Sequence, residues 1–263
     1  MDSLILQGWL KIFLNLARQN KMCLVIDDFQ WIDIGSLNLM ASLKEKDASL
    51  LLCCLLREEE LTRQPAEMPL VQFKDNLDRF FSGKVMVGNL SLAGTAEMVR
   101  TIFTGWEAEE KLPSLIHQTT QGNPLFIEEL LKFLVQKGFL FHQKGKWSKI
   151  EIQESDLPHT PQAAILERIK GLDKTAQEII ARAAVIGQDF STEMLHRMGK
   201  EDEGYVLDIL ESARRAGLIK ESVEADTEVP SGDNMSFVNE EVRQAISELI
   251  GQEEIQNLHH QLG

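Results

Sequence analysis

The chain has few cysteines and lacks any long hydrophobic run. It contains 3 Cys in 263 residues, at Cys23, Cys53 and Cys54. These thiols lie inside apolar, strand-like runs, which is typical of reduced, buried cysteines in a cytoplasmic protein and not of a disulfide framework. No run approaches the roughly 18 apolar residues of a membrane span, and polar residues interrupt the apolar N-terminus in helical phase. The sequence therefore predicts neither a membrane segment nor a signal peptide.

Positive charge is also scarce. The chain has 27 Lys and Arg against 41 Asp and Glu, a formal net charge of −14. Such a balance argues against a strongly negative partner, such as duplex nucleic acid or an anionic membrane. The rest of the composition, 43% hydrophobic and 26% charged, is that of a globular protein with room for more than one domain.

One apolar run ends in two adjacent carboxylates. Residues 23–26 read Cys-Leu-Val-Ile, and Asp27 and Asp28 follow directly. In parallel-sheet NTPases, a strand of this kind (a Walker B sequence) places one carboxylate near magnesium and another beside the attacking water. On this interpretation Asp27 serves the Mg²⁺ ion and Asp28 is catalytic. The alternative is a solvated acidic strand end before a helix.

The chain contains no G-x-x-x-x-G-K-[ST] loop, the element that holds the phosphates in such enzymes. The sequence therefore predicts half of a nucleotide site.

Residues 1–89 alternate between helical and strand-like patterns. Continuous apolar strands that alternate with helices predict an α/β fold with a parallel sheet covered on both faces. The expected elements are a helix from Leu6, a strand at 23–26, a helix at 36–46 with Ser36 as its cap, a strand at 49–56, a helix near 70–82 and a short strand at 84–87.

Arg57 directly follows the second apolar strand. The carboxyl ends of parallel strands meet at one edge of a sheet, so Arg57 is expected to converge with Asp27 and Asp28. Its guanidinium could contact a γ-phosphate, or it could pair with the acidic run at 58–60.

Beyond residue 89 the pattern is mainly helical. The sharpest turn is Gly122-Asn123-Pro124, where Asn is a helix cap and Pro the first helical residue. Segments 139–142 and 147–150 predict a hairpin. The final part predicts a winged helix, because helices at 161–170, 174–186, 192–198 and 202–216 precede strands at 218–223 and 235–238 and helices from Asn239 and Gln252.

Taken in order, these motifs resemble the STAND signalling ATPases of the AAA+ superfamily. The likeness is strongest to the ATPase modules attached to class III nucleotide cyclases, LuxR-like transcription regulators and kinases. The motifs are Asp-Asp-Phe-Gln-Trp-Ile-Asp at 27–33, Arg-Glu-Glu-Glu-Leu at 57–61, Gly-Asn-Pro-Leu-Phe-Ile-Glu-Glu-Leu-Leu at 122–131, and later stretches around 157–169, 181–190 and 236–246.

The resemblance implies three parts and assigns roles to the motifs. The parts are the C-terminal portion of a P-loop ATPase core at 1–89, a helical lid at 90–157 and a winged-helix domain at 158–263. Asp27 and Asp28 would bind magnesium and orient the attacking water, and Arg57 would contact the γ-phosphate of ATP. The turn formed by Gly122, Asn123 and Pro124 would pack on the nucleotide base.

The resemblance also implies that the chain is truncated. The first two strands of the family's sheet, and the phosphate loop after the first of them, are not in this sequence. The parent would be an ATPase that regulates an attached effector (a cyclase, a kinase or a transcription regulator) and carries sensor domains. The chain alone is expected to bind ATP weakly, with the strand at 84–87 closing onto the second apolar strand or with that edge left open.

Two other functions remain as alternatives. One is an origin-recognition-like AAA+ protein whose winged helix binds DNA. Residues 158–263 hold 20 Asp and Glu against 10 Lys and Arg, which disfavours contact with phosphates. The other is an interaction scaffold with an inactive nucleotide site.

Overall fold

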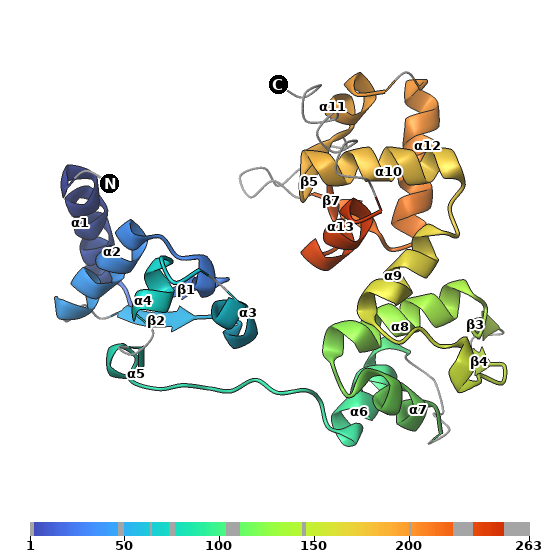
Figure 1. Cartoon of the computed structure of the whole chain (residues 1–263), viewed down its shortest axis with the longest axis horizontal. Helices are drawn as coiled ribbons and strands as arrows, with labels where there is room; N and C mark the ends of the chain where they lie inside the picture. Colours follow the sequence, from blue (N-terminus) through green and yellow to red (C-terminus); the bar gives the residue numbers. More distant parts are fainter. Residues whose placement is uncertain are drawn as a thin grey trace. The chain divides into compact units, whose positions relative to one another are not determined.

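A computed structural model describes residues 3–46, 50–63, 65–73, 77–103, 111–143, 146–199, 201–222 and 234–249. The chain divides into two compact units, residues 1–87 and 88–263 (Figure 1). Small sheets and many helices give a mixed α/β architecture. Within the described ranges, no helix is both long and apolar enough to cross a bilayer.

The first unit is built on two parallel strands. Strand β1 runs beside β2, with Met22 opposite Leu50 and Ile26 opposite Cys54, so the predicted parallel pairing of the apolar runs is confirmed. The elements are α1 (Ser3–Gln19), β1 (Met22–Ile26), the 3-10 turn η1 (Phe29–Trp31), α2 (Ile34–Glu45), β2 (Leu50–Cys54), α3 (Glu58–Arg63), α4 (Pro69–Phe73) and α5 (Leu77–Phe80).

Among the described residues, only one face of this sheet carries a core. Side chains that point to that face, such as Ile26 and Leu52, pack against Phe29, Leu37 and Met40. The alternate side chains are exposed, and they are Cys23, Val25, Leu51 and Cys53. The prediction of a sheet covered on both faces is therefore wrong for this unit, and so is the predicted burial of Cys23 and Cys53, whereas Cys54 is half-buried against the core. Its helices cover the first face and leave the second open.

Residues 84–87 form no strand. Val85 and Val87 are 87% and 91% exposed, and Lys84 forms an ion pair with Glu58 of α3. The high β-propensity of this segment is overridden because its backbone does not reach the sheet. Among the described residues, β1 and β2 pair only with each other, so each keeps one open edge.

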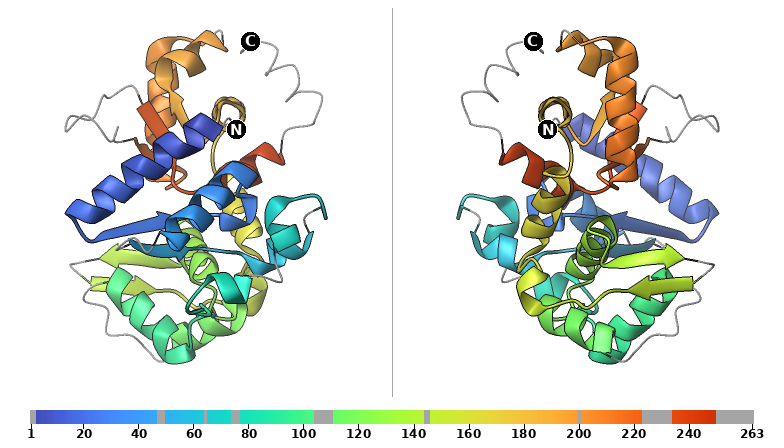
Figure 2. Two further views of the ribbon diagram at one scale, coloured as in Figure 1. Left: turned by 90° about the vertical axis from the view of Figure 1, so that its left-hand side faces the viewer. Right: turned by 90° about the vertical axis from the view of Figure 1, so that its right-hand side faces the viewer.

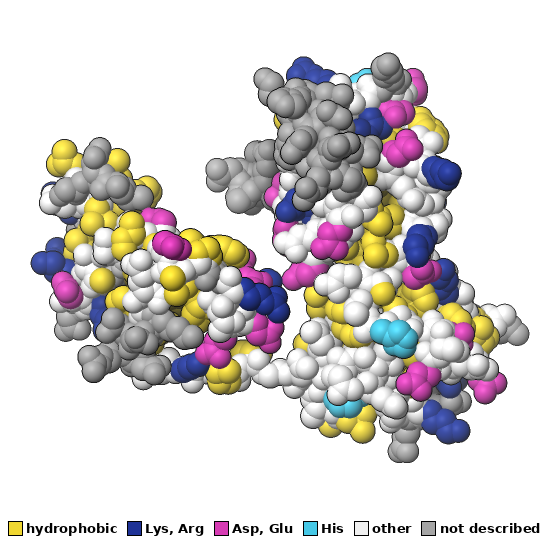
Figure 3. Space-filling model, in the orientation of Figure 1, with side chains coloured by type: hydrophobic (Ala, Val, Ile, Leu, Met, Phe, Trp, Pro, Cys, Tyr) yellow, Lys and Arg dark blue, Asp and Glu magenta, His cyan; other side chains and the backbone are white. Residues whose placement is uncertain are grey.

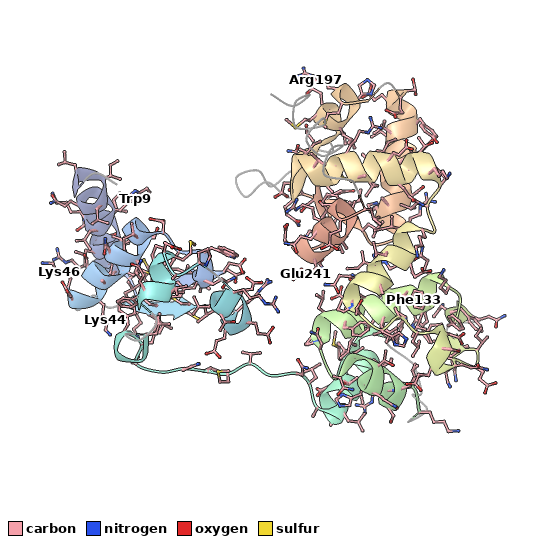
Figure 4. All side chains as sticks on the ribbon, viewed as in Figure 1. Trp9, Lys44, Lys46, Phe133, Arg197 and Glu241 are labelled. Atoms are coloured by element: carbon pink, nitrogen blue, oxygen red, sulfur yellow. The ribbon has the colours of Figure 1, made fainter. Side chains whose placement is uncertain are left out.

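Helix α1 has an apolar side that the described residues of its unit do not cover. Trp9 on this helix (Figure 4) is 50% exposed. Hydrophobic side chains are accordingly visible on the surface of the first unit in Figure 3. The exposed apolar residues of α1 are Leu4, Ile5, Trp9, Ile12 and Leu16.

The second unit begins with three helices and a hairpin. The predicted hairpin is confirmed, with Gln143 opposite Lys146, and β3 lies beside α8 (Figure 2). Buried side chains of α6, α7 and α8 form the core of this part. The elements are α6 (Leu92–Ile102), α7 (Lys111–Thr120), α8 (Pro124–Gln136), β3 (Leu140–Gln143), β4 (Lys146–Lys149) and the 3-10 turn η3 (Glu154–Asp156).

The remainder of this unit packs helices around a three-stranded antiparallel sheet with strand order β5-β7-β6. Gly217, at φ +66°, ends α12 as its sequence position indicated. Strand β5 was not predicted, and the helix expected from Gln252 lies outside the described residues. The elements are α9 (Pro161–Ile169), α10 (Lys174–Ile186), β5 (Asp189–Ser191), α11 (Thr192–Arg197), α12 (Glu203–Arg215), β6 (Ile219–Glu221), β7 (Asn234–Phe237) and α13 (Glu240–Ser247).

A buried arginine joins three segments of the second unit. Arg168 on α9 pairs with Glu129 on α8, and both side chains are fully buried. Arg168 also donates to the carbonyl oxygens of Ala216 and Gly217, each at 2.6 Å. Burial lowers the pKa of Arg168, while the attraction of Glu129 and Glu128 opposes that shift.

Candidate functional site

The ends of β1 and β2 bring Asp28 and Arg57 together. Backbone pairing continues past both strands, because the N–H of Leu55 donates to the carbonyl oxygen of Ile26 and the N–H of Phe29 donates to that of Leu55, each at 2.9 Å. The guanidinium Nε of Arg57 then lies 3.7 Å from Oδ1 of Asp28. Both side chains are about half exposed, so a ligand can reach them.

Asp27 and Asp28 differ in their hydrogen bonding and in their backbone conformation. Oδ1 of Asp27 accepts the backbone N–H of Asp28 at 2.8 Å, so part of this carboxylate is used within its own turn. Asp28 has a left-handed backbone, at φ 48° and ψ 41°, which Asp tolerates better than most residues. This conformation turns the chain sharply after β1, from strand into η1.

Gln30 connects these groups, and the sequence did not point to it. Its side chain is fully buried, and its Nε2 donates to Oδ1 of Asp28 at 2.8 Å and to Oε2 of Glu60 at 2.9 Å. Its Oε1 accepts the backbone N–H of Arg57 at 3.2 Å. The available signal was a polar amide at the start of a short turn, next to the buried Phe29.

Glu60 is the acidic partner of Arg57 at this edge. Its Oε1 lies 3.1 Å from Nη1 of Arg57. Of the two interactions that the sequence left open for Arg57, the ion pair with the acidic run is therefore present, alongside the contact with Asp28. The guanidinium lies close to two carboxylates.

Helix α2 begins at Ile34 with Asp33 as its cap, so the prediction of Ser36 as cap is wrong. The carboxylate of Asp33 accepts the backbone N–H groups of Gly35 at 2.7 Å and Ser36 at 3.0 Å, and also the Ser36 hydroxyl. These bonds, above all the one from the Ser36 hydroxyl, hold the pKa of Asp33 below its ordinary value. The carboxylate of Asp33 therefore caps α2 and is not part of the candidate nucleotide site.

The Gly122-Asn123-Pro124 turn belongs to the second unit. Gly122 has φ +74°, and a Cβ at this position would lie 2.0 Å from the carbonyl oxygen of Leu90. The Asn123 side chain accepts the N–H of Phe126 at 3.0 Å, and Pro124 is the exposed first residue of α8. Packing and capping alone explain Gly122 and Asn123, whereas exposed Pro124 is open to a ligand.

No three His, Cys, Asp or Glu side chains gather into a metal-binding group in the part of the chain that the structure describes. Mg²⁺ bound with nucleotides usually takes one or two carboxylates and completes its shell with phosphate and water oxygens. The free oxygen atoms of Asp27 and Asp28 fit that limited contribution.

The second unit also has an open, mainly apolar groove of about 880 Å³ between α6, α8 and the end of α12. Its lining includes Met98, Leu131 and Val135, with Glu128 and Lys132 among the charged residues. None of the predicted site residues lines this groove.

Comparison with known proteins supports the fold class. No protein-family model matches the chain. Over 125 residues it is 27% identical to hybrid signal transduction histidine kinase G of Dictyostelium discoideum, a match that covers 46% of this chain and 4% of the kinase.

A solved structure is similar over nearly the whole chain. It is a STAND protein (signal transduction ATPase with numerous domains) with a tetratricopeptide repeat sensor, from Pyrococcus horikoshii. The TM-score is 0.53 at 14% identity, over 96% of this chain and 31% of that one. The chain thus has a STAND-like fold and spans less than a third of either protein.

Proposed function

We propose that this chain is part of a STAND-type signalling ATPase. The observation that carries the proposal is the assembly of Asp28, Arg57 and Glu60 around buried Gln30, at the carboxyl ends of two parallel strands. Ligands of open α/β sheets bind at this edge. The STAND-like fold supports the same assignment.

Each site residue has a role suited to its chemistry. Asp27 contributes its free carboxylate oxygen to the coordination of Mg²⁺, and Asp28 orients the water that attacks ATP. Arg57 contacts the γ-phosphate in place of Glu60, because a guanidinium forms strong bidentate contacts with phosphate. Exposed Pro124 in the Gly122–Asn123–Pro124 turn packs against the nucleotide base.

The open sheet supports a further segment in the complete site. Parallel sheets are normally covered on both faces, whereas Val25 and Leu51 on one face are 58% and 64% exposed. A polypeptide that adds a parallel strand at the open edge and a helix over this face would complete the core. That segment would also bring the phosphate loop, a motif that this sequence lacks.

The second unit would transmit the nucleotide state. Helices α6 to α8 act as the lid, and the helices and three-stranded sheet after Pro158 support the proposed winged helix. The output would be control of an attached effector, and sensor domains would supply the input; the partial similarity to a signalling kinase supports such a role. The excess of acidic residues in 158–263 opposes a DNA-binding role.

ATP turnover by a longer polypeptide that includes a phosphate-loop segment tests the proposal. We expect turnover there, and ATP binding by the 263-residue chain weaker than about 1 mM, the upper end of common KM values. Asp28→Asn and Arg57→Ala should each reduce turnover at least about 100-fold, as loss of groups that act on the transition state does. Asp208→Asn, an exposed site on α12, is the matched control.

Micromolar ATP affinity in the 263-residue chain, measured by calorimetry, would contradict the weak binding expected of this chain alone. Unchanged turnover in the Asp28→Asn variant of the longer polypeptide would contradict the proposed site.

A further inference from the structure

All the polar atoms of the Gln30 side chain are used by groups at the two strand ends. Its amide nitrogen donates to Asp28 of the β1 end and to Glu60 of α3, and its oxygen accepts the N–H of Arg57 after β2. The side chain is fully buried. A single neutral residue thus links Asp28 to the backbone of Arg57.

Few side chains have the chemistry for this position. A carboxamide provides two N–H donors and one acceptor on the same planar group. Lys or Arg could donate to Asp28 and Glu60 but could not accept the N–H of Arg57. A hydrophobic residue would leave the part-buried N–H of Arg57 without this acceptor.

We infer that Gln30 is a positioning residue that couples the Asp28 carboxylate to the strand end carrying Arg57. The inference rests on the proposed function, because it is there that Asp28 and Arg57 act on the same phosphate. When Arg57 exchanges Glu60 for the phosphate, its backbone moves, and Gln30 passes that displacement to Asp28. Hydrogen bonds of this kind in a buried network are stronger than at the surface.

The coupling can be measured without nucleotide, on the isotope-labelled 263-residue chain. The reporter is the backbone N–H of Arg57, through its NMR chemical shift and its hydrogen-exchange rate. Asp28→Asn keeps an acceptor for Gln30 but removes the charge. We expect it to shift the Arg57 N–H signal in the otherwise unchanged chain and to shift it clearly less in a Gln30→Met background, where only the direct contact of Asp28 with the Arg57 side chain remains.

Gln30→Met should also speed hydrogen exchange at Arg57 by about 5-fold, since it removes a hydrogen bond worth about 1 kcal/mol and about 1.4 kcal/mol is tenfold. Gln72→Met is the matched control, because Gln72 is an exposed glutamine of α4 in the same unit. An equal response to Asp28→Asn in both backgrounds, or unchanged exchange at Arg57, would overturn the inference.

Gln30→Glu keeps the proposal testable if the Met variant does not fold. Glutamate has the same length, and in its ionised form it still accepts the N–H of Arg57 but donates to neither carboxylate. Slow exchange at Arg57 should therefore persist, while the response to Asp28→Asn is reduced to that of the direct contact between Asp28 and the Arg57 side chain. A response as large as in the unsubstituted chain would contradict the coupling.

Turnover by the longer polypeptide separates this inference from the proposed function. If that polypeptide turns over ATP, Gln30→Met should lower kcat more than it changes KM, and its effect should not add to that of Arg57→Ala. Additive effects would overturn the inference and leave the ATPase assignment intact. Absence of turnover, by contrast, would count against the proposed function. The NMR comparison of the response to Asp28→Asn with and without Gln30 would still decide whether Gln30 couples Asp28 to Arg57.

Discussion

Glu129 and Arg168 form an ion pair in which neither side chain is exposed to solvent. Lys132 makes a second contact with Glu129, at 3.0 Å, and the two carbonyl groups after α12 accept the remaining Arg168 donors. The desolvation of two charges is large, so such a pair is stable only while every partner is present. The pair therefore makes α8, α9 and the turn at Ala216 and Gly217 structurally interdependent.

Breaking this pair should destabilise the second unit strongly. We expect Glu129→Leu to lower its free energy of unfolding by about 3–5 kcal/mol, because it leaves the buried charge of Arg168 uncompensated. Arg168→Met should cost less, because Lys132 still pairs with Glu129. The double variant should lose less than the sum of the two. Urea denaturation monitored by circular dichroism measures these values.

Arg197→Ala is the control for that series. Arg197, labelled in Figure 4, pairs with Glu193 at the surface, where the two side chains are 76% and 72% exposed. Its loss should change stability by less than about 1 kcal/mol. Additive effects of Glu129→Leu and Arg168→Met would show that the two residues do not act together.

Gly122 and Gly138 allow backbone strain to be separated from steric conflict. Both have positive φ, at 74° and 75°, but a Cβ on Gly122 would meet the Leu90 carbonyl oxygen at 2.0 Å, whereas a Cβ on Gly138 would meet nothing within 4 Å. Gly138→Ala should therefore cost about 1 kcal/mol. Gly122→Ala should cost clearly more, as measured by thermal unfolding. Equal losses would contradict the close approach of Leu90.

Asp33 should stabilise α2 in a pH-dependent way. Asp33→Ala removes the cap and should cost about 1 kcal/mol at pH 7. Because the folded protein holds the pKa of Asp33 below its ordinary 3.8, this stabilisation is present above that value and is lost as pH falls through the folded pKa.

The difference in urea midpoint between the unsubstituted chain and the Asp33→Ala variant should therefore shrink at the acid end of the titration. Asp33→Asn is the control, since Asn is an equally good cap without a carboxyl group to titrate. A difference that is constant with pH would contradict the ionised cap.

Cys54 should react more slowly with alkylating reagents than Cys23 or Cys53. Burial, with a smaller contribution from Cys53, raises the pKa of the Cys54 thiol from an ordinary 9.0 to about 11. At pH 8 its thiolate fraction is then about 100-fold below that of a thiol with the ordinary value. Mass spectrometry after timed iodoacetamide labelling measures the three rates, and comparable rates would contradict the burial of Cys54.

The sequence predicted those parts of the fold that local patterns determine. The hairpin at β3 and β4, the parallel pair of apolar strands and the end of α12 at Gly217 all follow from periodicity and turn residues. Strand β5 was missed because its three residues are too short to show a period. The open sheet face was missed because apolar strand residues indicate burial without indicating what covers them.

The site was only partly visible in the sequence. Asp27, Asp28 and Arg57 stood out as the polar residues directly after apolar strands, and parallel topology brings such positions to one edge. Gln30 and Glu60 act through contacts 27 to 30 positions apart in the chain, for which local patterns give no signal. The conformation that joins them depends on packing in the whole first unit.

The two open strands also affect how the protein behaves in solution. The segments Met22–Ile26 and Leu50–Cys54 contain no charged residue and no proline, the features that usually protect an edge strand from pairing with another molecule. Uncharged segments of high β-propensity are those that form intermolecular cross-β aggregates. Lys21 and Asp27 on either side of β1 then serve as gatekeepers, and replacing them with neutral residues would make the chain prone to aggregate.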